Sequence, residues 1–275
     1  MRRCRSSIVD CRMAVGCRMS NVLHDMEPPS DIVTLHHVDA GYPGAVILHD
    51  VTFEVKRGEI FILLGGSGCG KSTIMKHMIG LNPVLGGELA IDGMEWNRKN
   101  RSALYRKIGV MYQSGALFGS MNLLQNVMLP LEEFTRLKRK AREERARELL
   151  ARVDLADAAM KMPAEISGGM KKRAAIARAM ALDPELLFLD EPSAGLDPIT
   201  SSALDDLILK LRKEQGVTFV VVTHELPSIF KIADRCAMFD KARRGMIALG
   251  DPRELKVSSK YPFVLDFFNR GEHHG

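Results

Sequence analysis

The distribution of hydrophobic and polar positions along the chain predicts a sheet of buried strands. Three predominantly apolar runs, at 60–64, 185–189 and 217–222, have the length and the β-branched and aromatic content of central parallel strands covered on both faces. A further run at 108–112 has the same character, whereas 46–55 alternates apolar and polar residues, which is typical of a strand with one solvated face. These patterns predict an α/β fold in which an antiparallel edge adjoins a parallel sheet.

Capping residues and helical periodicity predict the segments that connect these strands. Ser167 suits the N-cap of one helix, and Gly80 suits the end of another. Glutamates interleave with arginines at helical spacing between 136 and 153, which favours a solvated helix with local ion pairs over a surface for nucleic acid. The predicted helices are 73–79, 136–153, one after Ser167, 199–211, 229–235 and one that starts near Asp251; the other predicted strands are 32–38, 88–91, 236–240 and 246–249.

The glycine-rich stretch after the first buried run is the strongest chemical signal in the sequence. Its glycines permit positive φ and close backbone approach, so successive N–H groups can surround an anion at the start of a helix. Gly65, Gly70, Lys71 and Ser72 fit G-x-x-x-x-G-K-[ST], in which the lysine reaches the β- and γ-phosphates and the hydroxyl ligates Mg²⁺. An ordinary glycine turn is the alternative, and the correctly placed strand argues against it. The predicted phosphate-binding residues are Gly65, Gly66, Ser67, Gly68, Cys69, Gly70, Lys71, Ser72 and Thr73.

Two other buried runs deliver polar side chains to the same edge of the predicted sheet. Asp190 and Glu191 follow the run at 185–189, and open α/β sheets bind ligands at this end of their strands. Asp190 is placed to hold Mg²⁺ and Glu191 to orient or deprotonate an attacking water, although paired acids at a strand end also serve as helix caps. His224 follows the run at 217–222, which favours a phosphate contact over a role in the core.

Two further features admit both a functional and a structural interpretation. Tyr42 lies in a predicted turn at 39–44, where its ring would either pack locally or stack on a base. The stretch Ser167, Gly168 and Gly169 would form a plain capped helix start or, with its first N–H groups open, a contact for an anion. The residues alone leave both questions open.

Composition and charge narrow the class of protein. The 275 residues are 46% hydrophobic and 27% charged, and no apolar run approaches the length that crosses a bilayer. Residues 1–31 are expected to be a leader that is disordered or that precedes the true start of translation. Its three cysteines match no zinc or disulfide framework, and it lacks the apolar region of a secretory signal peptide. Residues 1–20 carry +4 of the net charge of +5, so the remainder, at +1, has no electrostatic reason to bind nucleic acid. Cys69 and Cys236 are predicted to be buried.

In order and spacing, these motifs resemble the ATP-binding cassette (ABC) ATPases over residues from about 32 to 255. The resemblance implies a P-loop NTPase with a RecA-like core, a helical subdomain inserted at about 114–180 and a C-terminal extension at 256–275. It also implies ATP and Mg²⁺ as cofactors and ATP hydrolysis as the activity. The resemblance implies that Tyr42 stacks on the adenine and that Ser167, Gly168 and Gly169 form the signature, with a dimer-contact loop at Asp197. It implies a glutamine loop at Gln113, which acts in catalysis and ligates Mg²⁺ together with Ser72 and Asp190. It also implies catalysis by Glu191 with the switch histidine His224.

The same resemblance implies partners. In this family two copies pair head to tail, so ATP on Lys71 and Ser72 of one copy is capped by Ser167 and Gly169 of the other. An integral-membrane permease dimer is the implied partner, pressing on the surface between Gln113 and Pro130. The expected location is therefore the cytoplasmic face of the inner membrane, with the chain attached peripherally.

A narrower resemblance concerns the transported molecule. The stretches 111–118 and 126–131 look like those of the ATPases of Mla-type phospholipid transporters, which work with MCE-domain lipid-binding proteins. Met170 shares that pattern, although the wider family has glutamine there, and Ile166 replaces its usual leucine. Two alternatives use the same motifs. A DNA-maintenance ATPase would need a long coiled-coil insert that this chain lacks before Ser167, and a soluble ABC protein of translation or cofactor assembly would need no permease.

Overall fold

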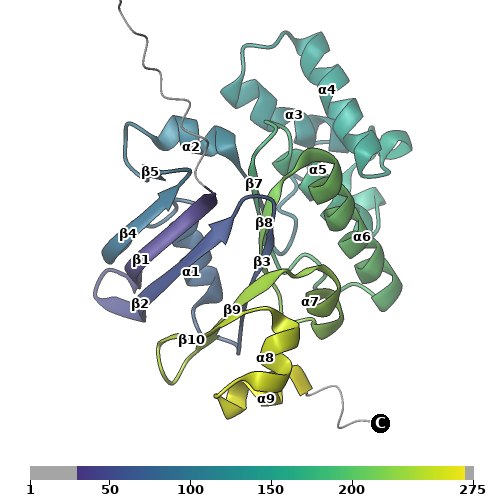
Figure 1. The fold of residues 1–275 in the computed structure, drawn as a ribbon. Helices are drawn as coiled ribbons and strands as arrows, with labels where there is room; N and C mark the ends of the chain where they lie inside the picture. Colours follow the sequence, from purple (N-terminus) through teal and green to yellow (C-terminus); the bar gives the residue numbers. More distant parts are fainter. Residues whose placement is uncertain (1–29, 270–275) are drawn as a thin grey trace, which may run out of the picture.

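The computed structural model describes residues 30–269, so the predicted leader lies almost entirely outside the described residues. Two sheets and the helices around them form the described part of the molecule (Figure 1). The helices are α1 (Lys71–Met78), α2 (Arg101–Lys107), α3 (Leu123–Phe134), α4 (Arg139–Arg152), α5 (Gly168–Ala179), α6 (Pro198–Gln215), α7 (Leu226–Ile232), α8 (Pro252–Ser258) and α9 (Pro262–Asn269), with 3₁₀ turns at Ala156–Ala158 and Pro163–Glu165.

The larger sheet contains the buried runs that the sequence predicts as strands. Its order is β10-β9-β3-β8-β7-β6, and the five strands from β9 to β6 are parallel, whereas β10 pairs antiparallel with β9. Every residue of β3 and β8 is buried, which explains their unbroken apolar character. The strands are β3 (Ile60–Gly65), β6 (Ile108–Met111), β7 (Leu186–Asp190), β8 (Thr218–Val222), β9 (Arg235–Asp240) and β10 (Gly245–Gly250).

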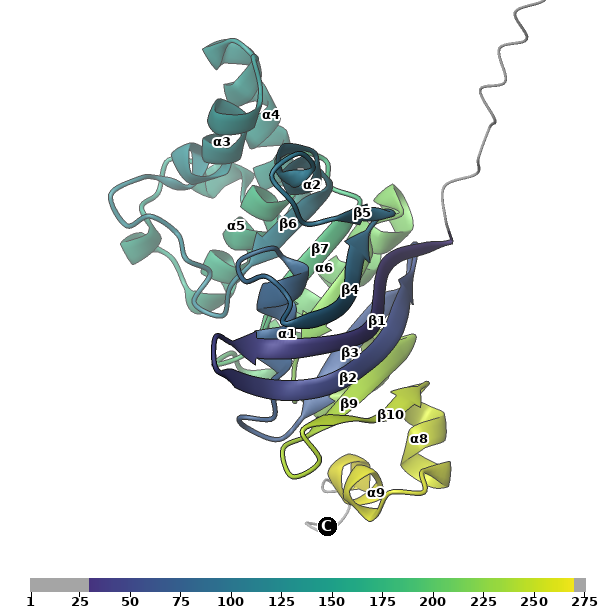
Figure 2. The same ribbon diagram turned by 90° about the vertical axis from the view of Figure 1, so that its left-hand side faces the viewer.

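The smaller sheet is antiparallel and has the order β2-β1-β4-β5. Figure 2 shows it curving across one face of the molecule. Its first strand is longer than the predicted 32–38, because register shifts at four places let it continue to Tyr42 instead of turning at Asp39. The strands are β1 (Asp31–Tyr42), β2 (Ala45–Lys56), β4 (Gly86–Ile91) and β5 (Met94–Glu95). The predicted alternating strand at 46–55 is confirmed within β2, and the sequence analysis predicted neither β5 nor α2.

The larger sheet separates two hydrophobic cores. Phe61 and Leu63 point from β3 toward the smaller sheet and α1, whereas Ile62 and Leu64 point toward the opposite core, which includes residues of α3 to α7 and α9. This alternation is the period of a strand, with both faces covered. The arrangement is therefore an antiparallel sheet, a central mostly parallel sheet and a helical layer, which confirms the predicted α/β fold.

The helical segments agree with the predictions in most places. Residues 114–180 contain α3, α4 and α5, and the arginines and glutamates of α4 form pairs at helical spacing, among them Arg145 with Glu148 at 3.2 Å. The predicted helix at 229–235 is wrong in its bounds, because α7 begins at Leu226, next to Pro227, and Arg235 already belongs to β9. Residues 262–269 form α9, whose apolar side chains pack into the helical core.

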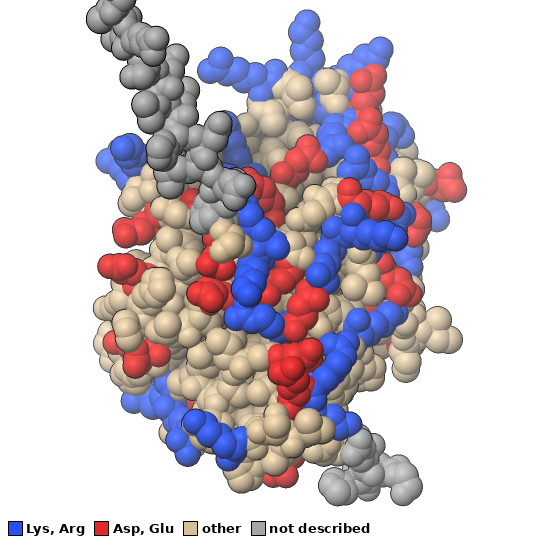
Figure 3. Space-filling view, viewed as in Figure 1, with Lys and Arg blue, Asp and Glu red and all other residues tan. Residues whose placement is uncertain are grey.

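Basic and acidic side chains interleave over much of the face in Figure 3, and lysines and arginines gather at the end formed by α3 and α4. None of the helices between residues 30 and 269 is long and apolar enough to cross a membrane.

Candidate functional site

The four predicted catalytic and phosphate-binding segments meet at one edge of the larger sheet. Because β3, β8, β7 and β6 are parallel neighbours, their carboxyl ends lie side by side. The residues that follow these strands are, in this spatial order, the glycine loop with Lys71, then His224, then Glu191 after Asp190 at the end of β7, and then Gln113. The sheet topology thus gathers segments that are far apart in the sequence.

The glycine loop has the conformation that its sequence predicts. Gly65 has φ of +140°, and a Cβ there would lie 2.4 Å from the carbonyl oxygen of Phe239. Gly70 has φ of +104°, and a Cβ would lie 2.8 Å from the side chain of Leu48. Both positions therefore require glycine. The Nζ of Lys71 donates to the carbonyl oxygens of Gly65 at 2.8 Å and Gly66 at 3.0 Å, so the lysine lies over the loop.

Glu191 and His224 form a direct pair. The Nδ1 of His224 donates to Oε1 of Glu191 at 2.9 Å. Glu191 has φ of +46°, in the left-handed region, and its N–H donates to the carbonyl of Val222 at 2.8 Å. Its side chain is 14% exposed, and Oε2 is buried without a hydrogen-bond partner among the described residues. An oriented carboxylate with one oxygen that has no hydrogen-bond partner suits the positioning or deprotonation of a water.

Asp190 lies half-buried beside this pair. Burial raises the pKa of its carboxyl group, the charge of Glu191 raises it further, and the ammonium groups of Lys76, Lys71 and Lys172 act in the opposite direction. A buried carboxylate whose pKa is raised by a neighbouring acid would be stabilised by a cation. The exposed hydroxyl of Ser72, this carboxylate and the exposed side-chain amide of Gln113 supply the oxygen ligands that Mg²⁺ prefers. These residues fit Mg²⁺, although the structure describes no three acidic, histidine or cysteine side chains grouped as a metal cluster in residues 30–269.

The sequence analysis missed Lys172, which lies on α5. Its side chain is buried, with 7% of the residue exposed, and its Nζ donates to the carbonyl oxygens of Gln113 at 2.5 Å and Glu191 at 3.0 Å. Burial lowers the pKa of this amine, while the charges of Glu191 and Asp190 raise it. A lysine among the small apolar residues of this helix was the available signal, but the pattern alone does not give its partners.

His77 is a second residue that the sequence analysis missed. It is buried on α1, and its Nε2 accepts from the N–H of Gly41 at 2.9 Å while Nδ1 lies 3.1 Å from the carbonyl of Asn82. His77 therefore fixes the backbone directly before Tyr42, whose ring is 42% exposed at the end of β1. The exposed ring remains available to stack on a base.

The predicted signature lies apart from the glycine loop within one chain. Ser167 is the N-cap of α5 and accepts from the N–H of Met170 at 3.3 Å. A Cβ at Gly168 would contact Leu196, and one at Gly169 would lie 2.5 Å from Thr200. Among the described residues, no hydrogen bond joins the signature to the glycine loop. The start of α5 therefore lies against the start of α6, and the close approach to Thr200 favours glycine at position 169.

The ABC transporter family matches residues 48–194 of the chain. The chain is 40% identical over 226 residues to the probable ribonucleotide transport ATP-binding protein mkl of Mycobacterium tuberculosis, a match that covers 81% of this chain and 62% of mkl. It is 37% identical over 243 residues to the intermembrane phospholipid transport system ATP-binding protein MlaF of Escherichia coli, covering 87% of this chain and 89% of MlaF. The chain thus spans less than two thirds of the mycobacterial relative.

Two solved structures have the same arrangement of elements. The dimeric post-hydrolysis state of the ATP-binding cassette MJ0796 bound to ADP and Pi has a TM-score of 0.71 at 30% identity, covering 80% of this chain and 98% of that one. CbiO1 of Clostridium perfringens, part of the ABC transporter complex cbiONQ, has a TM-score of 0.77 at 27% identity, covering 89% of this chain and 98% of its own.

Proposed function

The chain belongs to the ABC transporter family, and from that premise we propose that it is an ATP-hydrolysing subunit that drives phospholipid transport between membranes through a separate permease. The observation that carries the hydrolytic part is the pair of Glu191 and His224 at the edge of the sheet that also holds the glycine loop. Binding of nucleotide alone would not require a buried carboxylate with one unpaired oxygen at that edge of the sheet.

In this proposal, different residues of the chain bind the nucleotide, hold Mg²⁺ and activate the attacking water. The N–H groups of the glycine loop and the ammonium of Lys71 bind the phosphates, and Tyr42 receives the adenine. Ser72, Asp190 and Gln113 would hold Mg²⁺, which supplies charge stabilisation when bound. Glu191 orients and deprotonates the attacking water. His224 keeps the carboxylate in place through its bond to Oε1.

A second copy of the chain completes each site in this proposal. The signature at Ser167 to Gly169 does not reach the glycine loop of its own chain, and its helix start is exposed at Ser167 and Gly168. The N–H groups and positive end of α5 would stabilise the γ-phosphate charge bound by the partner copy. The dimeric MJ0796 structure supports this arrangement.

We place the permease contact at an apolar hollow beside Gln113. The hollow has a volume of about 260 Å³ and includes Leu81, which is 53% exposed, and Tyr112, which precedes Gln113. Phe118, in the predicted contact stretch, is 55% exposed, whereas Leu123 and Val127 of that stretch are buried in the core. The backbone of Phe118 is fixed by the buried Asn126, whose side-chain oxygen accepts from the N–H of Phe118 at 2.8 Å. An exposed apolar ring on a fixed backbone suits a partner helix.

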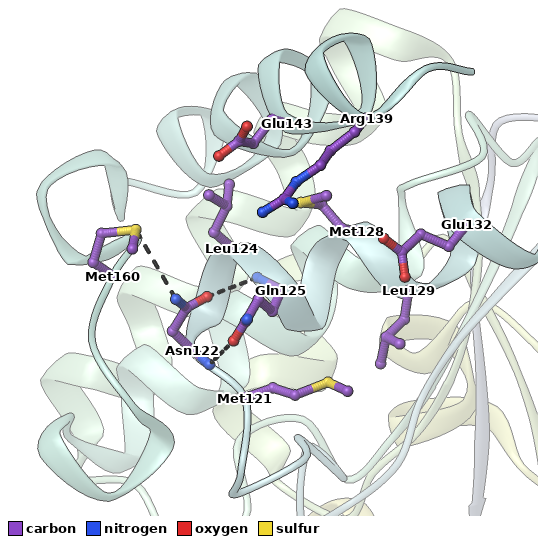
Figure 4. A pocket seen from close by; sticks show the side chains of 10 residues that line it. All are labelled: Met121, Asn122, Leu124, Gln125, Met128, Leu129, Glu132, Arg139, Glu143 and Met160. Carbon is purple, nitrogen blue, oxygen red and sulfur yellow. Dashed lines mark hydrogen bonds between the residues drawn. The ribbon is translucent and has the colours of Figure 1, made fainter.

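A neighbouring hollow between α3 and α4 fits this role less well. Figure 4 shows its lining, in which Asn122 and Gln125 bond one another and Glu143 and Arg139 project from α4. Asn122 and Gln125 form the capping box of α3, so these polar groups are explained by helix capping. The apolar hollow beside Gln113 is the better candidate for a permease helix.

Phospholipid is the substrate best supported by the comparisons. The match to MlaF extends over 89% of that protein, whereas the match to mkl, named for ribonucleotide transport, extends over 62%. An MCE-domain lipid-binding protein is the further partner that this substrate implies, and the location is the cytoplasmic face of the inner membrane. Ribonucleotide transport is the second candidate function, favoured by the 40% identity to mkl.

The test uses the complex purified in detergent with its copurifying membrane proteins. Reconstituted in vesicles, it should transfer fluorescent phospholipid to acceptor vesicles when ATP is present, and it should not take up labelled ribonucleotide. The reverse result would favour the second candidate. Copurification without any integral-membrane protein would favour a soluble ABC ATPase instead.

The contact with the permease is tested by charge insertion. Phe118→Glu and Leu81→Glu should weaken copurification of the permease while the subunit stays folded, because both side chains are more than half exposed. Leu249→Glu, at an exposed apolar position on the far edge strand β10, is the matched control. Full copurification and transport with both variants would show that the contact lies elsewhere.

A further inference from the structure

Lys172 is a buried cation at the centre of the site that the mechanism above does not use. It belongs to α5, the helix that begins with the signature, and its ammonium lies where α5 meets the ends of β6 and β7. A buried ammonium is costly unless its hydrogen bonds are satisfied, and an apolar side chain of similar size would often be as stable. Its presence therefore calls for a role beyond packing.

The contacts of Lys172 join three segments of the site. The Nζ donates to the carbonyl of Gln113 in the glutamine loop and to the carbonyl of Glu191. The same ammonium also lies close enough to the carboxylates of Asp190 and Glu191 to interact with their charges. A single side chain from the helical subdomain thus bonds both strand-end loops that carry the predicted metal ligands and the catalytic carboxylate.

The bond to Glu191 bears directly on the direction of its carboxylate. Glu191 has φ of +46°, a conformation that a non-glycine residue keeps only when its surroundings hold it there. Its N–H donates to the carbonyl of Val222, and its own carbonyl accepts from Lys172 at 3.0 Å and from the N–H of Ala194 at 3.2 Å, so both backbone groups are fixed. Without the ammonium of Lys172 the carbonyl would keep only the 3.2 Å bond from Ala194, and the backbone that directs the carboxylate toward His224 would be held less tightly.

We propose that Lys172 is a positioning residue that fixes the backbone of Glu191 and of the Gln113 loop relative to α5. The catalytic carboxylate is then aligned only when the helical subdomain packs against the sheet. This inference rests on the proposed ATPase function and assigns to Lys172 the link between the helical subdomain and the edge of the sheet that holds Glu191. The bonds to both carbonyls come from α5, so any displacement of α5 from the sheet removes them together.

The test is Lys172→Met, which keeps the length of the side chain and removes its three donors. We expect kcat for ATP hydrolysis to fall at least about tenfold, with KM for ATP changed less than about twofold, because binding depends on the glycine loop. Lys231→Met is the matched control. Lys231 also donates to two oxygens, both of Ser202, and pairs with Asp206, but it lies on α7 away from the site.

A double-mutant cycle separates positioning from a general structural effect. In a Glu191→Gln background, Lys172→Met should cause a much smaller loss of rate than the roughly tenfold loss in the wild type, because most of its effect acts through Glu191. An additive loss there, or an unchanged kcat in the single variant, would overturn the inference. If Lys172→Met does not fold, Lys172→Leu, which also lacks a donor, carries the same prediction. A wild-type protein without ATPase activity would instead refute the proposed function itself.

Discussion

Replacing Glu191 with glutamine separates the effect of the charge of the proposed catalytic carboxylate from that of its shape. Glutamine keeps an oxygen that can accept from Nδ1 of His224, so the 2.9 Å contact can persist. The other carboxylate oxygen is buried and has no hydrogen-bond partner among the described residues, so no existing bond is lost there. We therefore expect the melting temperature to stay close to that of the wild type and the change to act on hydrolysis.

The size of the effect follows from the role of a general base. Such a group contributes about 10²- to 10⁴-fold in rate, or about 2.7–5.5 kcal/mol of barrier. ATP binding should be retained, because Lys71 and the glycine loop are unchanged. The charge of Glu191 also raises the pKa of Asp190, so its removal should favour the ionised form of Asp190 that the proposed Mg²⁺ site requires. With ATP present, the variant should accumulate as a closed dimer.

The assay is phosphate release at saturating ATP, with dimer formation followed by size-exclusion chromatography. Glu225→Gln is the matched control, because that carboxylate lies 3.7 Å from the other nitrogen of His224 and is 47% exposed. A Glu191→Gln rate within about threefold of wild type, less than 1 kcal/mol of barrier, would refute the assigned role.

Three further predictions concern nucleotide binding and stability. His77→Ala removes the bond that fixes the backbone before Tyr42, and it should raise KM for ATP by about three- to tenfold, the equivalent of one hydrogen bond, with kcat nearly unchanged. Burial raises the pKa of Asp205, so its ionisation costs stability as pH rises above the unfolded-state pKa. The melting temperature of Asp205→Asn relative to the wild type should therefore rise between about pH 4 and about pH 7. An equal difference in melting temperature at both pH values would contradict this. Phe188→Ala empties a fully buried position and should cost about 3–5 kcal/mol, a fall in Tm of about 6–20 °C in calorimetry.

The fold and family could be predicted because their signals are local. The unbroken apolar character of β3 and β8 follows from burial on both faces, and the required glycines of the phosphate loop stand in a fixed pattern. The predictions of the α/β fold and of a resemblance to ABC ATPases are confirmed. The assignments of individual residues to catalysis and metal binding stay predictions that the geometry supports.

The features that could not be predicted from the sequence depend on tertiary packing. Lys172 lies in a helix of small residues, and only the assembled sheet brings it to the carbonyls of Gln113 and Glu191. Asp39 looks like a turn residue, yet pairing on both sides of β1 carries the strand past it to Tyr42. In each case contacts with residues distant in the sequence decide the outcome.

The pairing of β3 with β8 and β9 also constrains when the molecule can be completed during its synthesis. Ile62 lies beside Val221 and Cys236, so the sheet that carries the phosphate loop cannot close until the ribosome has released those late residues. All four strands of the smaller sheet lie between Asp31 and Glu95, so this sheet is able to pair early. We therefore expect a nascent chain arrested before Val221 to expose the apolar strands 60–64 and 186–189 to chaperones and to lack affinity for nucleotide.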